Sequence, residues 1–270
     1  MGLTARSSGL NLLRENFNID YSKKNPIIAL AGNPNTGKST VFNGLTGLRQ
    51  HTGNWPGKTV TQAQGNFRYQ GQEFTLIDLP GTYSLLANST EERIARDFIC
   101  FARPDATIVV ADATNLERNL NLVLQVTELT DNVILCLNLM DEAERKNIKI
   151  DVAGLKNDLQ IPVVPTVARD GKGLKELKNT VYDIVNKNIV VHPYRVKYSP
   201  EIENAVEELV QELRTMLTGI EKYINLHWLS LRLLEGDKTI MRSIKDLFLK
   251  DDSFETKTEG VVQTDGVNYI

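Results

Sequence analysis

Residues 32–40 read Gly-Asn-Pro-Asn-Thr-Gly-Lys-Ser-Thr, and this stretch constrains the fold of the 270-residue chain more than any other. The apolar run before it, residues 26–31, predicts a buried strand, and residues 41–46 can continue as a helix. A strand, a glycine-bounded loop, Lys-Ser and a helix together form a phosphate-binding loop in its required context. The loop N–H groups and the positive end of the helix dipole bind the anion. We therefore expect a nucleoside triphosphate here, with Lys38 near its β- and γ-phosphates and the Ser39 hydroxyl on Mg²⁺.

Residues 26–192 alternate predicted strands with predicted helices. Apolar runs predict further strands at 73–78, 106–111, 133–138 and 161–165, and helical spacing is present at 91–102, 115–130, 151–159 and 173–187. We expect residues 48–57 to be a loop, residues 58–67 to be an edge strand with one solvated face, and residues 69–72 to be a hairpin turn. The alternation predicts an α/β fold with a doubly wound, mostly parallel sheet. Ligands of such sheets bind at the carboxyl ends of the strands.

The hydrophobic pattern changes near residue 193. From Glu201 onward, apolar residues recur at helical spacing and predict a small all-helical second domain. We therefore divide the chain into a flexible N-terminal arm (1–25), a nucleotide-binding domain (26–192), the helical domain (193–250) and a disordered tail (251–270). The polar, glycine-bearing ending suggests a truncated chain.

The composition describes a soluble protein with enough apolar residues for a core. The chain is 41% hydrophobic, and its formal net charge of −3 argues against a nucleic-acid partner. Cys100 and Cys136 each lie in an apolar run, so we expect buried free thiols rather than a disulfide or metal cluster. The apolar runs are shorter than the roughly 20 residues that span a bilayer. We expect a soluble fragment in a reducing compartment.

Two further motifs follow predicted strands. Asp78-Leu79-Pro80-Gly81 has the spacing of a magnesium-holding aspartate followed by a glycine whose N–H bonds the γ-phosphate. Asn138-Leu139-Met140-Asp141 ends a later strand, and a carboxylate at Asp141 can accept hydrogen bonds from both N1–H and the 2-amino group of guanine. Adenine lacks both donors, so such a site selects GTP over ATP. We expect Asn138 to tie this loop to the phosphate loop, and a backbone N–H of residues 166–168 to meet the guanine O6.

Four stretches together resemble one family of GTP-binding proteins. Residues 32–40, 51–57 (His-Thr-Gly-Asn-Trp-Pro-Gly), 78–85 and 112–120 (Asp-Ala-Thr-Asn-Leu-Glu-Arg-Asn-Leu) are similar to the cytosolic part of the ferrous iron transport protein B family. The resemblance covers residues 26–250 and includes that family's helical domain, which is similar to a guanine-dissociation inhibitor. It implies a GTP-hydrolysing regulatory domain of a bacterial ferrous iron transporter, at the cytoplasmic face of the membrane. The implied partner is the membrane transport domain of the same parent protein.

The resemblance also implies residue roles. Thr59 corresponds to the threonine of the first switch loop, which senses Mg²⁺ and the γ-phosphate, and Asn35 to an asparagine that helps bind K⁺ in potassium-stimulated relatives. The expected nucleotide-binding residues are Asn33, Pro34, Asn35, Thr36, Gly37, Lys38, Ser39, Thr40, Gly57, Lys58, Thr59, Asp78, Gly81, Asn138, Met140, Asp141, Thr166, Val167 and Ala168. Of these, the expected catalytic residues are Lys38, Thr59, Gly81 and Asn35; the expected magnesium ligands are Ser39, Thr59 and Asp78.

Some positions depart from the family pattern. Leu139 stands where a lysine usually covers the guanine ring, Lys58 where an apolar residue is usual, and Val167 where a serine is usual. Thr82 follows Gly81 where many GTPases place the glutamine that orients the attacking water, and it is too short for that reach.

Alternatives stay open on the sequence alone. A soluble GTPase of ribosome or tRNA maturation shares all the nucleotide motifs, and a nucleotide-dependent interaction switch with little turnover is a third hypothesis. A homo-oligomer is also compatible with the sequence. We interpret His51, Trp55 and His227 as structural residues.

Overall fold

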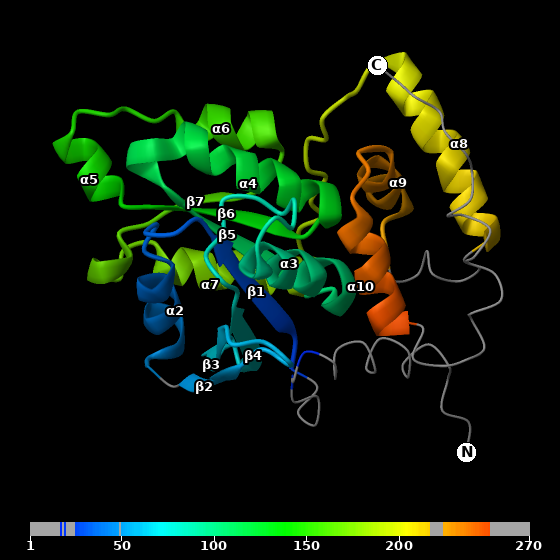
Figure 1. The fold of residues 1–270 in the computed structure, drawn as a ribbon. Helices are drawn as coiled ribbons and strands as arrows, with labels where there is room; N and C mark the ends of the chain where they lie inside the picture. The colour runs from blue at the N-terminus through cyan, green and yellow to red at the C-terminus, as the bar shows by residue number, and fades with distance from the viewer. Residues whose placement is uncertain (1–16, 18, 20–24, 49, 217–223, 249–270) are drawn as a thin grey trace. The chain divides into compact units, whose positions relative to one another are not determined.

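The computed structural model describes residues 17, 19, 25–48, 50–216 and 224–248 (Figure 1). The chain divides into two compact units, Met1–Lys197 and Tyr198–Ile270. The sequence pattern places the change after residue 192, a few residues earlier. The expected tail, residues 251–270, lies outside the described residues.

The first unit is built on a seven-stranded sheet with the order β2-β3-β4-β1-β5-β6-β7. Its strands are β1 (Ile27–Gly32), β2 (Gln50–Asn54), β3 (Thr61–Tyr69), β4 (Gln72–Asp78), β5 (Ala106–Asp112), β6 (Val133–Asn138) and β7 (Val163–Pro165). β1 pairs in parallel with β4 and β5, and β5, β6 and β7 continue in parallel, whereas β2 and β3 are antiparallel. The predicted doubly wound, mostly parallel sheet is confirmed.

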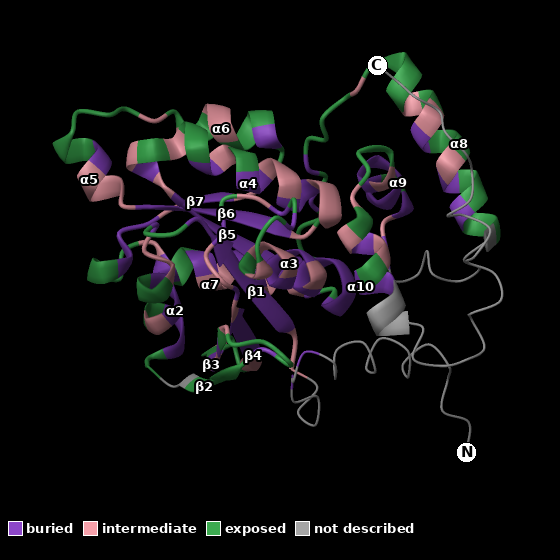
Figure 2. Cartoon of the chain, in the orientation of Figure 1, coloured by how far each residue is buried: buried purple, intermediate pink, exposed green. Residues whose placement is uncertain are grey.

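Helices cover both faces of this sheet (Figure 1). They are α2 (Lys38–Thr46), α3 (Thr90–Asp97), the π-helix η1 (Phe98–Ala102), α4 (Leu116–Leu129), α5 (Met140–Arg145), α6 (Val152–Leu159) and α7 (Leu174–Val185). α2 and α7 contact each other and the sheet, while α4 contacts β5, β6 and η1. Because both faces are covered, every residue of β1 and β6 is buried, as Figure 2 shows in purple. This burial explains why these strands are continuous apolar runs.

The register of the parallel strands brings the expected motifs to one edge. Leu30, two residues before the end of β1, pairs with Asp78 at the end of β4. Asp112 and Asn138 pair at the ends of β5 and β6. The phosphate loop and the two aspartate motifs therefore follow strand ends that lie along the same side of the sheet.

The segment expected to be a loop contains a strand. β2 pairs with β3 from Gln50↔Gly65 to Asn54↔Thr61, so β3 lies between β2 and β4 and is not the expected edge strand. His51 to Asn54 are exposed, so no alternation of apolar and polar residues marks β2 in the sequence. The hairpin turn expected at 69–72 is confirmed: Tyr69 pairs with Gln72, and Gly71 has φ 79°.

An aromatic cluster anchors the tip of the β2–β3 hairpin. Trp55 is 2% exposed, and its ring meets Phe98 edge-on at 5.5 Å between centroids. Phe17 lies edge-on to both rings, at 6.4 Å from Trp55 and 5.4 Å from Phe98. The Phe17 carbonyl also accepts a hydrogen bond from Gln62 Nε2 (3.1 Å). The expectation of a flexible arm is therefore wrong at Phe17 and Ile19, which are both buried.

The second unit contains three described helices, α8 (Pro200–Met216), α9 (Leu226–Leu234) and α10 (Lys238–Phe248), as the sequence predicts. α8 and α9 pack together, and His227 Nε2 lies 3.4 Å from Glu203 Oε2 across them. His227 is exposed, so its contact is with α8 rather than with the core. Among the described residues, no helix has both the length and the apolar character needed to cross a bilayer.

Candidate nucleotide-binding site

The phosphate loop connects β1 to α2. Gly37 precedes α2 with φ 81°, a left-handed conformation that favours glycine, and no side chain caps this nine-residue helix. A Cβ on Gly37 would overlap the amide nitrogen of Asn138, and one on Gly32 would lie 2.6 Å from the Val110 carbonyl oxygen. Both glycines therefore permit close packing. The uncapped N–H groups at the start of α2 suit an anion such as phosphate.

The phosphate loop contains two asparagines, Asn33 and Asn35, in different environments. Asn33 is 3% exposed, and neither its amide nitrogen nor its amide oxygen has a hydrogen-bond partner among the described residues. Such orphaned buried groups are uncommon in folded proteins. Asn35 is exposed and has φ 66°. The amide group of Asn33 thus has no partner among the described residues, and Asn35 is exposed to solvent.

The end of β4 lies against the phosphate loop. Thr82 N donates to Gly32 O (3.2 Å), and a Cβ on Gly81 would lie 3.5 Å from Pro34. Lys38 Nζ forms a hydrogen-bonded ion pair with Asp78 Oδ1. Burial raises the pKa of Asp78, and the nearby charge of Lys38 opposes that rise. Lys38 was expected near the phosphates and Asp78 near Mg²⁺. In this structure the two side chains pair with each other.

Asn138 joins three loops. It is 1% exposed, and its Nδ2 donates to Thr36 O (3.0 Å) in the phosphate loop. Its Oδ1 accepts from Thr166 Oγ1 (3.2 Å) and from Ala168 N (3.1 Å). The expected connection between Asn138 and the phosphate loop is present in this structure. One buried side chain fixes the spacing between the phosphate loop and the two loops expected to hold the base.

The amides of residues 166–168 are already committed. Thr166 N donates to Leu137 O (2.8 Å), Val167 N to Lys172 O (3.1 Å) and Ala168 N to Asn138 Oδ1. The N–H group expected to meet the guanine O6 is therefore not free in this structure. Two residues, Thr166 and Val167, separate β7 from the short 3₁₀ helix η3 (Ala168–Asp170). The end of β6 takes the amides of Thr166 and Ala168, and the loop after η3 takes that of Val167.

Asp141 lies at the start of α5 and is held by arginines. Its Oδ2 accepts from Arg169 Nη2, on η3, and from Arg145 Nη2 (3.3 Å), one turn along α5. Its Oδ1 is buried and has no hydrogen-bond partner among the described residues. The sequence interpretation missed both arginines. Two weak signals were available in the sequence. Arg145 follows Asp141 by four residues, one helical turn, and Arg169 comes directly after residues 166–168, which were expected to contact the base.

The first switch segment is exposed, and the backbone hydrogen bonds that the structure describes for it lie within its own connection. Thr59 is exposed and makes no hydrogen bond to any described residue. It lies in the connection after Trp55, which is closed by bonds from Trp55 N to Val60 O (2.9 Å) and from Lys58 N to Trp55 O (2.9 Å). Of the expected site, the phosphate loop, residues 78–82, 138–141 and 166–169 are linked by hydrogen bonds and ion pairs in this structure. The role expected for residues 57–59 stays a prediction.

The segment after Gly81 is held by α4, which the sequence interpretation also missed. Thr82 is buried, and its hydroxyl donates to Ser84 O (2.7 Å). Leu85 N donates to Gln125 Oε1 (2.6 Å), and the Arg118 guanidinium lies 4.1 Å from the centre of the Tyr83 ring. These contacts give a role to the otherwise unexplained stretch at residues 112–120, from which Arg118 comes.

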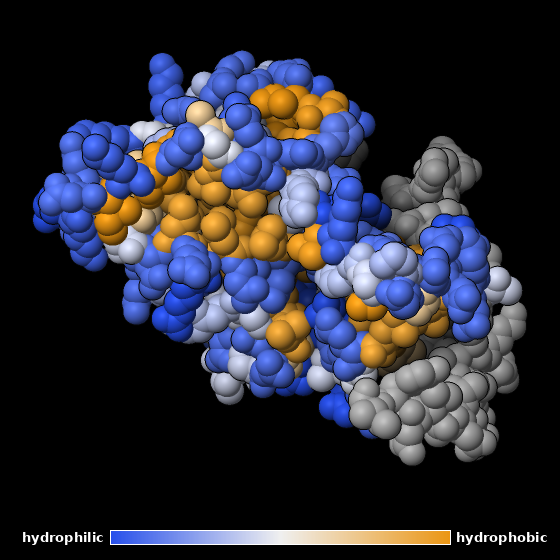
Figure 3. Space-filling view, turned by 90° about the horizontal axis from the view of Figure 1, so that it is seen from above, coloured by the Kyte–Doolittle hydropathy of each residue, from blue (hydrophilic) through white to orange (hydrophobic). Residues whose placement is uncertain are grey.

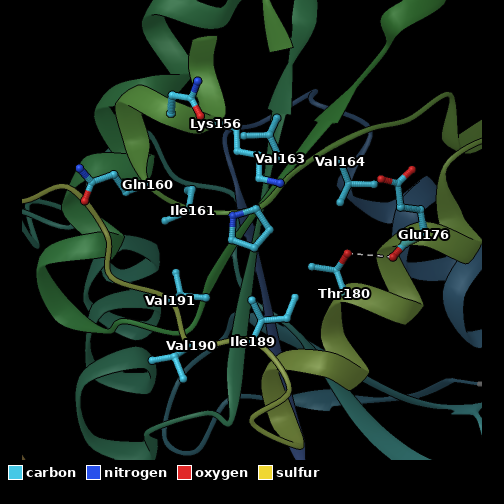
Figure 4. Close-up of a pocket in the computed structure, with 12 residues that line it drawn as sticks. Lys156, Gln160, Ile161, Val163, Val164, Glu176, Thr180, Ile189, Val190 and Val191 are labelled. Atoms are coloured by element: carbon cyan, nitrogen blue, oxygen red, sulfur yellow. Dashed lines mark hydrogen bonds between the residues drawn. The ribbon is translucent and has the colours of Figure 1, made fainter. Parts of the chain in front are cut away.

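A cavity of about 420 Å³ lies elsewhere, at the β7 edge of the sheet. Figure 4 shows Ile161, Val163, Ile189 and Val191 around it, contributed by β7 and the segments flanking α6 and α7. Figure 3, which views the α6 side, shows apolar side chains gathered in a broad patch. None of the nucleotide motifs lines this cavity, so the motif geometry, rather than the cavity, defines the candidate site.

Comparison with known proteins decides the family. Residues 26–181 match the model of a family described as ferrous iron transport protein B, and residues 198–264 match its cytosolic helical domain. The chain belongs to the ferrous iron transport protein B (FeoB) family. The Fe(2+) transporter FeoB of Escherichia coli strain K12 is 40% identical over 217 residues, which are 78% of this chain and 27% of that protein. A Porphyromonas gingivalis fusion of Fe(2+) transport protein A and FeoB is 41% identical over 82% of this chain and 27% of its own length.

Solved structures of FeoB agree with this assignment. The cytosolic domain of Thermotoga maritima FeoB in a GDP form has a TM-score of 0.74 at 38% identity, covering 87% of this chain and 90% of that one. Its GMPPNP form has a TM-score of 0.73 at 37% identity, covering 88% and 92%. The FeoB G-domain of Methanococcus jannaschii covers 60% of this chain and 98% of its own, at 46% identity and a TM-score of 0.54. The present chain therefore carries a FeoB-type G domain and helical domain, and it spans about a quarter of the length of its curated relatives.

Proposed function

We propose that this chain binds guanine nucleotides and hydrolyses GTP. The observation that carries the proposal is the position of Asn138, which bonds to Thr36, Thr166 and Ala168 at once. A site that uses one buried side chain to set the distance between a phosphate loop and a base-binding carboxylate suits one nucleotide of fixed length. The unpaired Oδ1 of Asp141 and the uncapped start of α2 supply acceptors for the base and donors for the phosphates.

The residues present also fit magnesium. Mg²⁺ is usually held by one or two protein oxygens together with phosphates and waters, rather than by a dedicated cage. Among the described residues, no group of three His, Cys, Asp or Glu side chains could hold a metal ion, which agrees with that mode. Ser39 and Asp78 would hold the ion, and Thr59 would join them after the hairpin connection moves. When bound, the ion would neutralise charge on the phosphates.

Lys38 must exchange partners when nucleotide binds. In this structure its charge is paired with that of Asp78. Phosphate oxygens offer Lys38 an alternative anion, and a cation beside Asp78 would replace the lysine charge. We propose that this exchange separates the nucleotide-free and nucleotide-bound arrangements of the site.

Hydrolysis needs a group other than a glutamine after Gly81. The Thr82 hydroxyl is committed to Ser84 and the side chain is buried, so it cannot orient a water. We propose that Asn35, which is exposed on the loop, supplies a neutral oxygen to K⁺, and that the ion stabilises charge developing between the β- and γ-phosphates. GTP hydrolysis should then be faster in KCl than in NaCl at equal ionic strength. The difference should vanish in Asn35→Ala while nucleotide binding persists; equal wild-type rates in the two salts would exclude the potassium mechanism.

Transport is a property of the longer relatives. Those relatives are named Fe(2+) transporters, and this chain corresponds to about a quarter of their length. We propose that it acts as the GTP-dependent regulatory part of a ferrous iron transporter, at the cytoplasmic face of the membrane, with the membrane domain of the same parent protein as its partner. Membership of the FeoB family favours this function over one in ribosome or tRNA maturation.

Single-turnover hydrolysis of GTP tests the enzymatic part of the proposal. With Mg²⁺ present and wild-type protein in excess over GTP, the protein should release phosphate. ATP should be cleaved far more slowly under the same conditions, and the Lys38→Ala variant should lose hydrolysis. Binding of GTP without phosphate release would leave a nucleotide-dependent interaction switch as the function. Failure to bind GTP would contradict the proposal altogether.

A further inference from the structure

The two oxygens of Asp141 are in different environments. Oδ1 is buried and unpaired, whereas Oδ2 accepts from both Arg169 Nη2 and Arg145 Nη2. A carboxylate oxygen has two lone pairs, so these two donors saturate Oδ2. Among the described residues, Oδ1 alone lacks a donor, so it keeps its capacity to accept a hydrogen bond once a base reaches it.

Guanine needs both oxygens. Its N1–H and its 2-amino group lie side by side, and each donates to one oxygen of a facing carboxylate. Hypoxanthine, the base of inosine nucleotides, has the same N1–H but no 2-amino group, so it needs one oxygen. The saturated Oδ2 therefore affects guanine and hypoxanthine differently.

We infer that Arg169 is a specificity-determining residue that competes with the guanine 2-amino group for Asp141 Oδ2. The inference rests on the proposed guanine site. Arg169 comes from η3, after β7, whereas Asp141 lies in the first turn of α5. Their ion pair therefore joins the two loops expected to bind the base. Guanine must open this pair to use both carboxylate oxygens, and part of its binding free energy is lost in doing so.

The structure provides a second position for the displaced arginine. Glu142 Oε1 lies 3.6 Å from Arg169 Nη1, and it also pairs with Arg145. Arg169 is 56% exposed, so leaving Asp141 for Glu142 and water does not strand a buried charge. Arg145 is the weaker competitor, because it sits on the same helix as Asp141 and keeps Glu142 as its close partner. Arg169 is therefore the donor whose removal frees Oδ2.

The test compares the affinities of GDP and IDP for wild type and Arg169→Ala. Removing Arg169 should raise the ratio of GDP to IDP affinity about two- to fivefold, the range expected for an exposed ion pair. IDP affinity should change little, because Arg169 pairs with Oδ2 and not with Oδ1, the oxygen that would accept from N1–H. Arg195→Ala is the matched control: it removes another partly exposed arginine, paired with Asp131, and should leave the ratio unchanged.

Ionic strength gives an independent readout on the unaltered protein. Added sodium chloride screens an exposed pair, so the GDP to IDP ratio of wild type should rise with salt, and that of Arg169→Ala should not. An unchanged ratio in Arg169→Ala, or an equal loss of affinity for both nucleotides, would overturn the inference and make Arg169 a simple support for the base. Failure of wild type to bind either nucleotide would instead refute the proposed guanine site.

Discussion

Replacing Asn138 by alanine tests whether one buried side chain holds the nucleotide loops together. The substitution removes the donor to Thr36 O and the acceptor of Ala168 N, and both are buried backbone groups. Leaving a buried polar group unsatisfied costs about 1–3 kcal/mol. Thr166 keeps a longer bond, to Leu137 O (3.4 Å), so it adds little. We therefore expect Asn138→Ala to lower the free energy of unfolding by about 2–6 kcal/mol.

Urea denaturation followed by tryptophan fluorescence measures this loss. The chain has two tryptophans, Trp55 in the first unit and Trp228 in the second, so a Trp228→Phe background reports the first unit alone. Asn119→Ala is the matched control. Asn119 is also a buried asparagine, but it makes a single local bond to Asn115 O (2.7 Å) and its Oδ1 is already unpaired. A loss in Asn138→Ala no larger than in Asn119→Ala would refute the reasoning.

Three further predictions concern buried residues of the first unit. Trp55→Ala should destabilise the first unit by about 3–5 kcal/mol and speed amide exchange at Trp55 and Lys58, whereas His51→Ala, at an exposed position, should do neither. Because burial raises the pKa of Asp78 above its ordinary 3.8, this group contributes stability that is present below that pH and lost as the pH rises through the raised pKa. The unfolding free energy of wild type minus that of Asp78→Asn should therefore fall as the pH rises above 3.8; a flat difference would contradict it. Burial raises the pKa of Cys136 to about 12 and also raises that of Cys100, so iodoacetamide should label neither thiol in the native protein at pH 8 and both after unfolding.

The buried part of the fold was predictable from sequence because burial leaves a direct record in residue type. β1, β5 and β6 are apolar runs with helices on both faces, and the strand–loop–helix context of residues 32–40 places the phosphate loop. β2 was not predictable, since its stability comes from backbone pairing with β3 while its described side chains face solvent. Phe17 was missed for a related reason: its partners, Trp55 and Phe98, are distant in sequence.

The site was predictable where a recognised motif implies a contact, even between residues distant in the chain. The motif around Asn138 implied its connection to the phosphate loop, and that bond is present. The occupied amides of residues 166–168 depend on how β7 enters η3, which no residue type indicates. The pairing of Arg169 with Asp141 likewise joins two loops whose separation is set by the whole sheet. Tertiary contacts that no motif implies were therefore beyond the sequence.

The most direct test of the guanine site is an exchange of base preference at Asp141. Asp141→Asn keeps an oxygen for N1–H but replaces the second acceptor by a donor, which suits the 2-carbonyl of xanthine instead of the 2-amino group of guanine. The variant should bind GTP more weakly than wild type by about 2–4 kcal/mol, the scale of a charge-assisted bond left unmade, and should gain affinity for xanthosine triphosphate relative to GTP. Titration of both nucleotides into both proteins decides the matter: reversed preference supports a base-reading carboxylate at Asp141, and unchanged affinities for both would contradict it.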